Sequence, residues 1–187
     1  MLLIAVAAAT ANNLVLVYLL GLGPVLDSSY RPGRVAGLTL AITLLLMLTT
    51  SLAHLLDRWV LVPYHLEYLR IIGYLVLVGA VASLADQVLR WTSERLHPET
   101  RPALRLVAIH SAVLGVALLT SGTTASLAGA LALGLGAGLG FGLVLLVFAG
   151  LETRLEQAPA SLRGPAIALV TLGMMSLAFL GFSGIGT

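Results

Sequence analysis

The chain has 187 residues, of which 59% are hydrophobic and 10% charged, and its mean hydropathy is +1.04. Soluble domains carry about 25% charged residues, so this composition excludes a water-soluble globule and a disordered chain. The net charge of +2 comes with ten basic residues, all arginine, which are too few and too scattered for nucleic-acid binding. The absence of cysteine excludes disulfides, thiolate metal ligands and cysteine nucleophiles from this chain.

Five charge-free stretches, one of them long enough for two spans, predict six membrane-spanning helices. About 20 residues are needed to cross the roughly 30 Å of hydrocarbon in a bilayer, so the 46-residue charge-free stretch 106–151 is interpreted as two spans. The polar residues 120–124 predict the turn between these two spans. The pattern predicts an all-α polytopic membrane protein, with spans at about 2–22, 35–56, 66–89, 104–120, 125–149 and 164–185.

The distribution of arginine predicts how these spans are oriented. The first, third and fifth loops hold eight arginines, whereas the second loop and the adjoining end of the third span hold only Arg58 and Arg70. Basic residues concentrate in the cytoplasmic loops of membrane proteins. We therefore expect loops one, three and five to be cytoplasmic and both termini to lie outside.

The six predicted spans divide into two halves of three within a single integral membrane domain. Because three is odd, a repeat that relates the halves has inverted topology. Residues 13–16 resemble residues 111–114 at an offset of 98, and the same offset superimposes spans three and six. A match of four residues also arises by chance, so the expected repeats, about 1–90 and 104–187, depend on the odd span count as well.

The first predicted span has two features that are unusual for a membrane helix. Asn12 and Asn13 lie about 18 Å from the chain start if the segment is helical, which is membrane depth. Residues 21–24 then interrupt the pattern, because Pro24 lacks a backbone donor and restricts its neighbour. Two interpretations stay open: a helix that ends at Pro24 with both asparagines bonded to neighbouring helices, or a half-helix with its break at a midplane site.

The fourth predicted span carries His110 and Ser111 near its start. A histidine inside a membrane span is costly and often functional. The alternative is a neutral histidine bonded to a backbone carbonyl of a neighbouring helix. We take Asn12, Asn13 and His110 as candidates for a midplane polar site or ion path, and the sequence offers no catalytic triad or paired-carboxylate site.

Other patterns have structural interpretations. The glycines from Gly134 to Gly142 lie inside an apolar span with no preceding strand and no lysine, so they predict close helix packing rather than a phosphate loop. Spacings of three or four residues predict side-chain pairs near the ends of spans two and three. His54 and Asp57 together are also a candidate entry point for a proton or cation, with a solvated interfacial pair as the alternative. The predicted pairs are His54 with Asp57, Glu67 with Arg70, and Asp86 with Arg90.

Several segments resemble one family of membrane subunits. Residues 12–24 read Asn-Asn-Leu-Val-Leu-Val-Tyr-Leu-Leu-Gly-Leu-Gly-Pro, and residues 111–119 read Ser-Ala-Val-Leu-Gly-Val-Ala-Leu-Leu. Residues 163–171 and 175–179 add the most specific matches. Together these segments are similar to the RnfA/NqrE family over nearly the whole chain, and more so than to its sister family, RnfE/NqrD.

The resemblance implies a six-helix inverted repeat, with helices 1 and 4 broken or half-length, in the inner membrane of a bacterium. It implies a protein that is not catalytic alone but belongs to an Rnf or Nqr complex, which passes electrons from ferredoxin to NAD or from NADH to quinone. Such complexes move Na⁺ or H⁺ across the membrane. The protein would pair with an RnfE/NqrD-like sister, and the two would share a [2Fe-2S] centre held by two cysteines from each.

This sequence departs from the family at those ligand positions. The two family cysteines fall on Gly23 and Ser111, His110 replaces an asparagine, and Arg105 replaces a proline. Thiolate is the preferred ligand of iron–sulfur centres, so we expect no conventional ligation from this chain. The alternatives are a variant site assisted by His110 and a partner that compensates.

Two other functions fit the same resemblance. One is a small secondary ion transporter or channel that kept the fold without redox work. The other is a purely structural subunit whose site has decayed.

Overall fold

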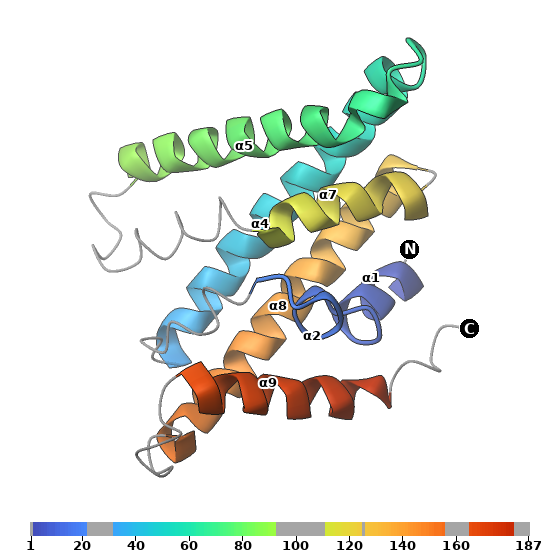
Figure 1. Ribbon diagram of the computed structural model, residues 1–187. Helices are drawn as coiled ribbons and strands as arrows, with labels where there is room; N and C mark the ends of the chain where they lie inside the picture. Colours follow the sequence, from blue (N-terminus) through green and yellow to red (C-terminus); the bar gives the residue numbers. More distant parts are fainter. Residues whose placement is uncertain (1, 22–31, 93–110, 125, 156–164, 182–187) are drawn as a thin grey trace.

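The computed structural model describes residues 2–21, 32–92, 111–124, 126–155 and 165–181. Within these ranges the regular structure is entirely helical, so the prediction of an all-α protein is confirmed. A π-helical turn, η1, and a 3₁₀ turn, η2, connect two of the helices (Figure 1). The elements are α1 (Leu2–Ala9), α2 (Leu14–Tyr18), α4 (Pro32–Leu56), η1 (Asp57–Leu61), η2 (Glu67–Leu69), α5 (Arg70–Thr92), α7 (Ser111–Thr123), α8 (Leu127–Leu155) and α9 (Pro165–Leu180).

Three helical segments are long and apolar enough to cross a membrane. They are Val35–Leu61, Glu67–Ala85 and Leu127–Leu151, and two shorter apolar helices cover Ser111–Gly122 and Ala166–Leu180. The segment predicted as the first span is not one helix, because α1 has eight residues and α2 has five. The predicted count of six spans therefore stays a prediction.

The turn predicted at 120–124 lies further along the chain than expected. Helix α7 continues to Thr123, and α8 begins at Leu127. The hydroxyls of Thr120 and Thr124 donate to the carbonyls of Val116 and Thr120, at 2.8 and 2.7 Å. Each hydroxyl bonds a carbonyl one turn back, so the polar side chains are satisfied locally and the helix continues through Thr123.

Helices α4 and α8 cross closely at the centre of the molecule (Figure 1). Gly134, Gly138 and Gly142 of α8 face α4, and a Cβ added at Gly138 would lie 2.8 Å from the Thr43 Cβ. Gly142 meets Thr39 and Gly134 meets Thr50, so rising numbers on α8 face falling numbers on α4. The two helices are therefore antiparallel, and the predicted packing role of these glycines is confirmed.

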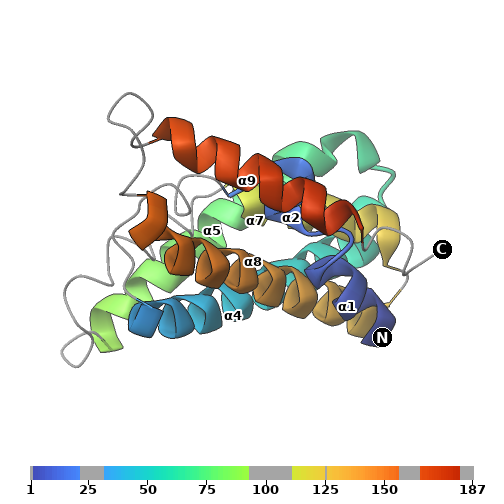
Figure 2. The same cartoon turned by 90° about the horizontal axis from the view of Figure 1, so that it is seen from below.

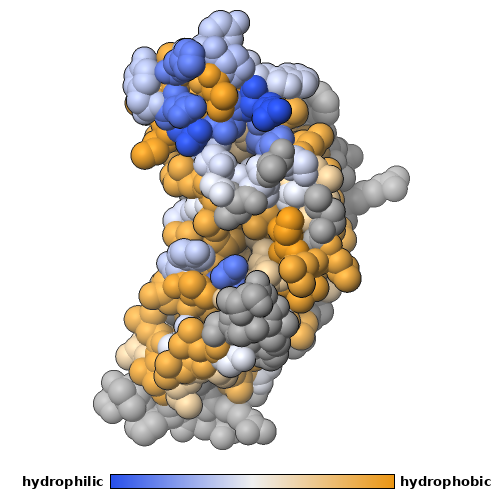
Figure 3. All heavy atoms as spheres, turned by 90° about the vertical axis from the view of Figure 1, so that its right-hand side faces the viewer, coloured by the Kyte–Doolittle hydropathy of each residue, from blue (hydrophilic) through white to orange (hydrophobic). Residues whose placement is uncertain are grey.

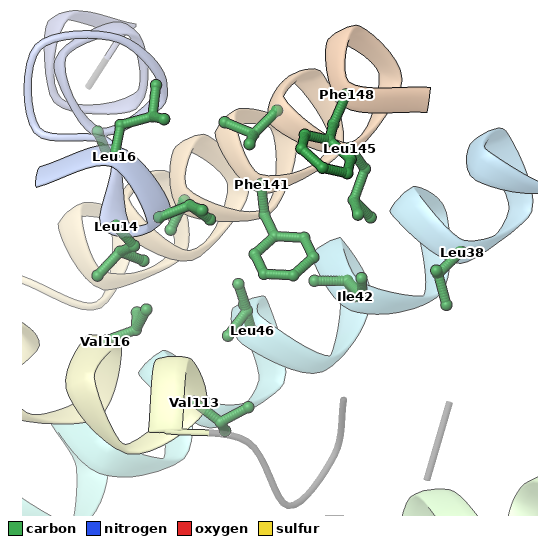
Figure 4. Close-up of a cluster of buried hydrophobic side chains, with 14 of the residues drawn as sticks. Leu14, Leu16, Leu38, Ile42, Leu46, Val113, Val116, Phe141, Leu145 and Phe148 are labelled. Carbon is green, nitrogen blue, oxygen red and sulfur yellow. The ribbon is translucent and has the colours of Figure 1, made fainter. Parts of the chain in front are cut away.

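The other helices surround this central pair. Helix α9 lies on the side of α8 opposite α4 (Figure 2), and α5 packs on α4 and α7. The main core lies where α2, α4, α7 and α8 meet, and there Phe141 of α8 points toward Ile42 and Leu46 of α4 (Figure 4). Each of these three side chains is at most 2% exposed.

The face of the molecule drawn in Figure 3 is mostly apolar, and large hydrophobic side chains are exposed on most of the helices. On α5, the side chains of Ile71, Ile72 and Val76 are each at least 60% exposed. Soluble monomers rarely expose contiguous apolar surface on this scale, so the surface fits contact with lipid or with other membrane helices. Hydrophilic side chains gather at the end where α4 turns into α5 (Figure 3), and we call this group the polar cap. The polar cap comprises His54, Asp57, Arg58, His65, Glu67 and Arg70.

The close crossing predicts that Gly138→Ala destabilises the protein. The added methyl group would meet the backbone and side chain of Thr43, and overpacking of this kind costs about 1–3 kcal/mol. Thermal unfolding of the purified protein in detergent measures the effect. Gly150→Ala on the same helix is the matched control, because an added Cβ there has no neighbour within 4 Å. Equal stability of the two variants would contradict the close crossing.

Candidate functional site

The first apolar stretch is interrupted at its two asparagines. Helix α1 ends at Ala9, and the N–H of Asn12 donates to the Ala7 carbonyl at 2.7 Å. Asn13 then has an extended backbone, with φ −62° and ψ 121°, and forms the N-cap of α2. The region is broken, as the half-helix interpretation expected, and one break lies between Ala9 and Asn13; the interruption predicted at Gly21–Pro24 lies, except for Gly21, outside the described residues. The alternative of a single helix ending at Pro24 is wrong, since α2 already ends at Tyr18.

The side chain of Asn13 bonds to the backbone on both sides of this break. Its Oδ1 accepts from the N–H groups of Val15 and Leu16, at 3.0 and 3.4 Å. Its Nδ2 donates to the carbonyls of Ala9 and Gly140, at 2.9 and 3.0 Å. Asn13 is 0% exposed. One buried amide therefore caps α2, closes the end of α1 and ties both helices to α8.

The far end of α2 is held in a different way. Leu19 adopts a left-handed conformation with φ 53°, and its N–H donates to the Leu14 carbonyl. Gly21 follows with φ 100°, a conformation that favours glycine. The Oγ of Ser176 on α9 donates to the carbonyl of Leu16 at 2.6 Å. Helix α2 is therefore fixed at one end by its own N-cap and along its length by a hydroxyl from another helix.

Two glycines of α8 allow the broken helix to lie against it. A Cβ added at Gly140 would lie 2.8 Å from both the Ala9 carbonyl oxygen and Nδ2 of Asn13. A Cβ at Gly136 would collide with the backbone of Ala5. A side chain at position 140 would displace Asn13 or Ala9, so the absence of a Cβ at Gly140 lets the Asn13 amide reach the Gly140 carbonyl.

The two adjacent asparagines have different environments, although the sequence suggested a common role for them. Asn12 is exposed, whereas Asn13 is buried. Asn12 lies on the wall of a cavity of about 210 Å³, lined otherwise mainly by aliphatic side chains of α1, α2, α7 and α8. Tyr18 adds a second polar group to this wall. The structure therefore assigns a structural role to Asn13 and leaves Asn12 as the polar group that faces open space.

The second candidate region begins at α7. Ser111 is the first residue of this helix and is exposed, while Gly23 and His110 lie outside the described residues. The side chain of Leu20, at the end of the first region, contacts the position where Gly115 lacks a Cβ. The described end of the first region thus packs one turn after Ser111, so the two candidate regions approach each other inside the protein.

The charged groups of the polar cap pair differently from the prediction. The Nε of Arg70 donates to Oδ1 of Asp57 at 2.8 Å, across 13 residues. The predicted pairing of Glu67 with Arg70 and of His54 with Asp57 is corrected by this bond, which joins the π-helical turn to the start of α5. The side chains of Asp86 and Arg90 lie outside the described part of the chain.

The residues at the two family ligand positions do not fit an iron–sulfur centre. Glycine offers no donor at position 23, and the only donor at Ser111 is a hydroxyl. Such centres are held by thiolates, with imidazole as a known substitute. Within the described ranges, no group of three or more His, Cys, Asp or Glu side chains is arranged to hold a metal ion.

Comparison with known proteins identifies the family. The family described as "Rnf-Nqr subunit, membrane protein" matches residues 1–186. This chain belongs to the Rnf-Nqr family. Among curated relatives, each named as the A component of an ion-translocating oxidoreductase complex, the protein of Pseudomonas aeruginosa is 43% identical over 186 residues. Those of Shigella flexneri and Alcanivorax borkumensis are each 40% identical, and every one of these alignments covers 98% of this chain and 96% of the relative.

The resemblance to the RnfA/NqrE family that the sequence suggested is thus confirmed, as is the membrane location. Ser176 and Gly140 are structural residues of the site that the sequence did not reveal. Gly140 belongs to a recognisable glycine pattern, but nothing in that pattern identifies it as the partner of Asn13. Ser176 is a single hydroxyl in an apolar helix and carries no signal of its own.

The geometry predicts that Asn13→Ala destabilises the protein much more than Asn12→Ala. Removing Asn13 leaves the first N–H groups of α2 and the Gly140 carbonyl without their partner, at a cost of about 1–3 kcal/mol. Replacing the exposed Asn12 is expected to change the stability by no more than about 0.5 kcal/mol. Thermal unfolding of the two variants in the same detergent makes the comparison. A larger loss for Asn12→Ala would contradict the assigned roles.

Proposed function

We propose that this chain is the RnfA-type component in the membrane core of an Rnf-type ion-translocating oxidoreductase complex, and that it is not catalytic by itself. The carrying observation is the break at Asn13, whose hydrogen-bonded side chain holds the short helix α2 against α8. Broken helices are tolerated at membrane depth where they are buried in protein or line a cavity. The names of the relatives, which align over almost the whole chain, support the same assignment.

We infer an inverted repeat from the offset of 98 between similar segments of the two halves and from the placement of two long helices. The same shift carries α4, residues 32–56, onto 130–154, which falls within α8. Inverted halves require that these equivalent helices run in opposite directions, in agreement with the antiparallel crossing of α4 and α8.

In this proposal the protein pairs with an RnfE/NqrD-like sister and other subunits of the complex, and contributes surface for the movement of Na⁺ or H⁺. The membrane is the inner membrane of a bacterium, with the arginine-rich loops one, three and five in the cytoplasm. Because the chain has no cysteine, single cysteines introduced into these loops and into the polar cap can be labelled from one side at a time. Labelling of the polar cap from the cytoplasm would reverse the orientation.

The proposed mechanism is alternating access at the two broken regions. In this mechanism α2 and the start of α7 move relative to the central pair of α4 and α8, and the redox state of the complex selects between two positions. Asn13 provides the fixed point on α8 about which α2 moves. Asn12, which faces the cavity, and His110 supply polar groups along the ion path.

This mechanism predicts that Asn13→Ala and His110→Ala reduce the number of ions moved per electron. Coupling free energies of this kind correspond to about fivefold or greater effects. The measurement uses the purified complex in liposomes, with electron transfer and ion uptake followed together. Ser83→Ala is the control, because its exposed hydroxyl bonds only within α5, to Gly79. If full coupling survives Asn12→Ala, Asn13→Ala and His110→Ala, the mechanism is wrong.

For the cofactor, we propose that this chain holds no conventional half of a [2Fe-2S] centre. Iron analysis and electron paramagnetic resonance of the purified complex are expected to show no signal that depends on Ser111, so Ser111→Ala leaves the spectrum unchanged. A normal intramembrane cluster signal that is lost in Ser111→Ala or His110→Ala would overturn this proposal.

The absence of cysteine ligands favours one alternative function, a small secondary ion transporter or channel without a redox reaction. This function requires no cluster ligand from the chain. The isolated protein, reconstituted into liposomes, would then move ions without an electron donor. Strict dependence on the other subunits and on an electron donor supports the complex.

A further inference from the structure

The turn between α4 and α5 carries three exposed aromatic side chains. Trp59 of η1, Tyr64 of the turn that follows and Tyr68 of η2 are 70%, 70% and 76% exposed. They lie among the charged groups of the polar cap, at one end of the molecule (Figure 1). Each of these side chains combines a large apolar ring with a polar indole N–H or hydroxyl, and both parts are open to a partner outside the chain.

The backbone of this turn is held in one shape. The N–H of Val62 donates to the Asp57 carbonyl at 3.0 Å, across five residues. His65 has a left-handed conformation with φ 54°, which persists only where the surrounding structure holds it. The bond from Arg70 to Asp57, at 2.8 Å, joins the two ends of the turn. The three aromatic rings are therefore carried by a fixed platform.

The inner side of the same turn is fixed in the core. Leu61 is 4% exposed and packs in one cluster with Ala53 of α4, Tyr74 of α5 and Ala117 of α7. Trp59 lies only two residues before Leu61. Because the core holds Leu61, the turn cannot rotate to bury Trp59 within the chain. The aromatic rings can lose contact with water only against an outside partner.

The lengths of the flanking helices place this turn at the level of the lipid headgroups. Residues 35–56 contain no charged residue and cover about 33 Å at 1.5 Å per residue. This length matches the roughly 30 Å of hydrocarbon in a bilayer. The charged residues Asp57 and Arg58 follow directly, and Glu67 and Arg70 mark the same boundary where α5 begins. The aromatic residues between these charges therefore fall in the headgroup layer.

The chemistry of the turn favours zwitterionic lipid as the partner. Tryptophan and tyrosine are enriched at membrane–water interfaces, where the ring lies in apolar surroundings and the polar tip stays wet. The two carboxylates of the polar cap balance its two guanidinium groups when the histidines are neutral, so no net charge attracts anionic lipid. The exposed apolar face of α5 begins directly after the turn, with Ile71 63% exposed.

We propose that Trp59, Tyr64 and Tyr68 form an aromatic anchor that binds the headgroup layer of zwitterionic lipids. The rings lie beside the upper ends of the acyl chains, and the indole N–H and the hydroxyls bond to ester carbonyls and to water. The anchor fixes the depth at which α4 and α5 leave the membrane. It goes beyond the proposed redox function, because an ion transporter of the same fold would use it equally.

Fluorescence quenching measures the depth of the aromatic anchor. The chain has two tryptophans, so Trp91→Phe leaves Trp59 as the one tryptophan of the full chain in phosphatidylcholine liposomes. A nitroxide on the lipid headgroup is expected to quench Trp59 about twofold more strongly than a nitroxide at the end of the acyl chain, which lies about 15 Å deeper. Equal quenching by the two lipids, or stronger quenching by the deeper nitroxide, would overturn the proposal.

Val76 provides the matched control for depth. It is 68% exposed on α5 and lies six residues after Arg70, about 9 Å further along the helix. Val76→Trp, combined with Trp59→Phe and Trp91→Phe, is expected to be quenched more strongly by the nitroxide at the end of the acyl chain. The same quenching ratio at positions 59 and 76 would contradict the difference in depth and overturn the proposal.

Another subunit of the complex is the competing partner for this surface, and photocrosslinking within the purified complex distinguishes the two. The photoreactive amino acid p-benzoylphenylalanine is introduced in place of Trp59 or Tyr64, and the complex is irradiated in zwitterionic lipid. Adducts with the mass of the lipid are expected on this chain at both positions. A crosslink to another subunit, or the absence of a lipid adduct at both positions, would overturn the proposal.

Discussion

Every backbone N–H and carbonyl that lies in apolar surroundings needs a partner within the protein, because the bilayer core supplies no water. An unbroken helix meets this need by itself, but the break between α1 and α2 leaves backbone N–H and carbonyl groups without helical partners. Asn13 restores the lost bonds with four hydrogen bonds from one amide. The arrangement of the surrounding helices follows, since α8 must present a bare carbonyl and α9 must present a hydroxyl at this place.

The need for hydrogen-bond partners at this break explains why glycines lie on two faces of α8. Toward α4 they allow a close antiparallel crossing, and toward α1 they admit the backbone of Ala5 and Ala9. A side chain at Gly140 would occupy the space of the Asn13 amide. The stability of the broken helix is therefore determined on α8, more than one hundred residues away in the sequence, as much as on the segment itself.

Much of the fold could be predicted from the sequence, because hydropathy and helix packing act locally. The long apolar helices α4, α5 and α8 and the role of the α8 glycines were within reach of composition and spacing. The position of the break was not, since residues 2–22 are apolar on both sides of Asn12 and the hydropathy pattern does not distinguish one helix from two. The pairing of Arg70 with Asp57 and the bond from Ser176 to Leu16 join distant residues, and spacing along a helix contains no information on such contacts.

The threonines that face the α8 glycines have a consequence for mechanics. The hydroxyl of Thr43 donates to the Thr39 carbonyl at 2.7 Å, so its proton is used within α4, and the threonine side chains and backbone of α4 lie directly against the α8 glycines. Two backbones in such close contact cannot slide past each other by rearranging side chains, because few side-chain atoms lie between them. The crossing is therefore stiff, and displacements within the protein are easier at helices that contact the central pair less closely, such as α2 and α9.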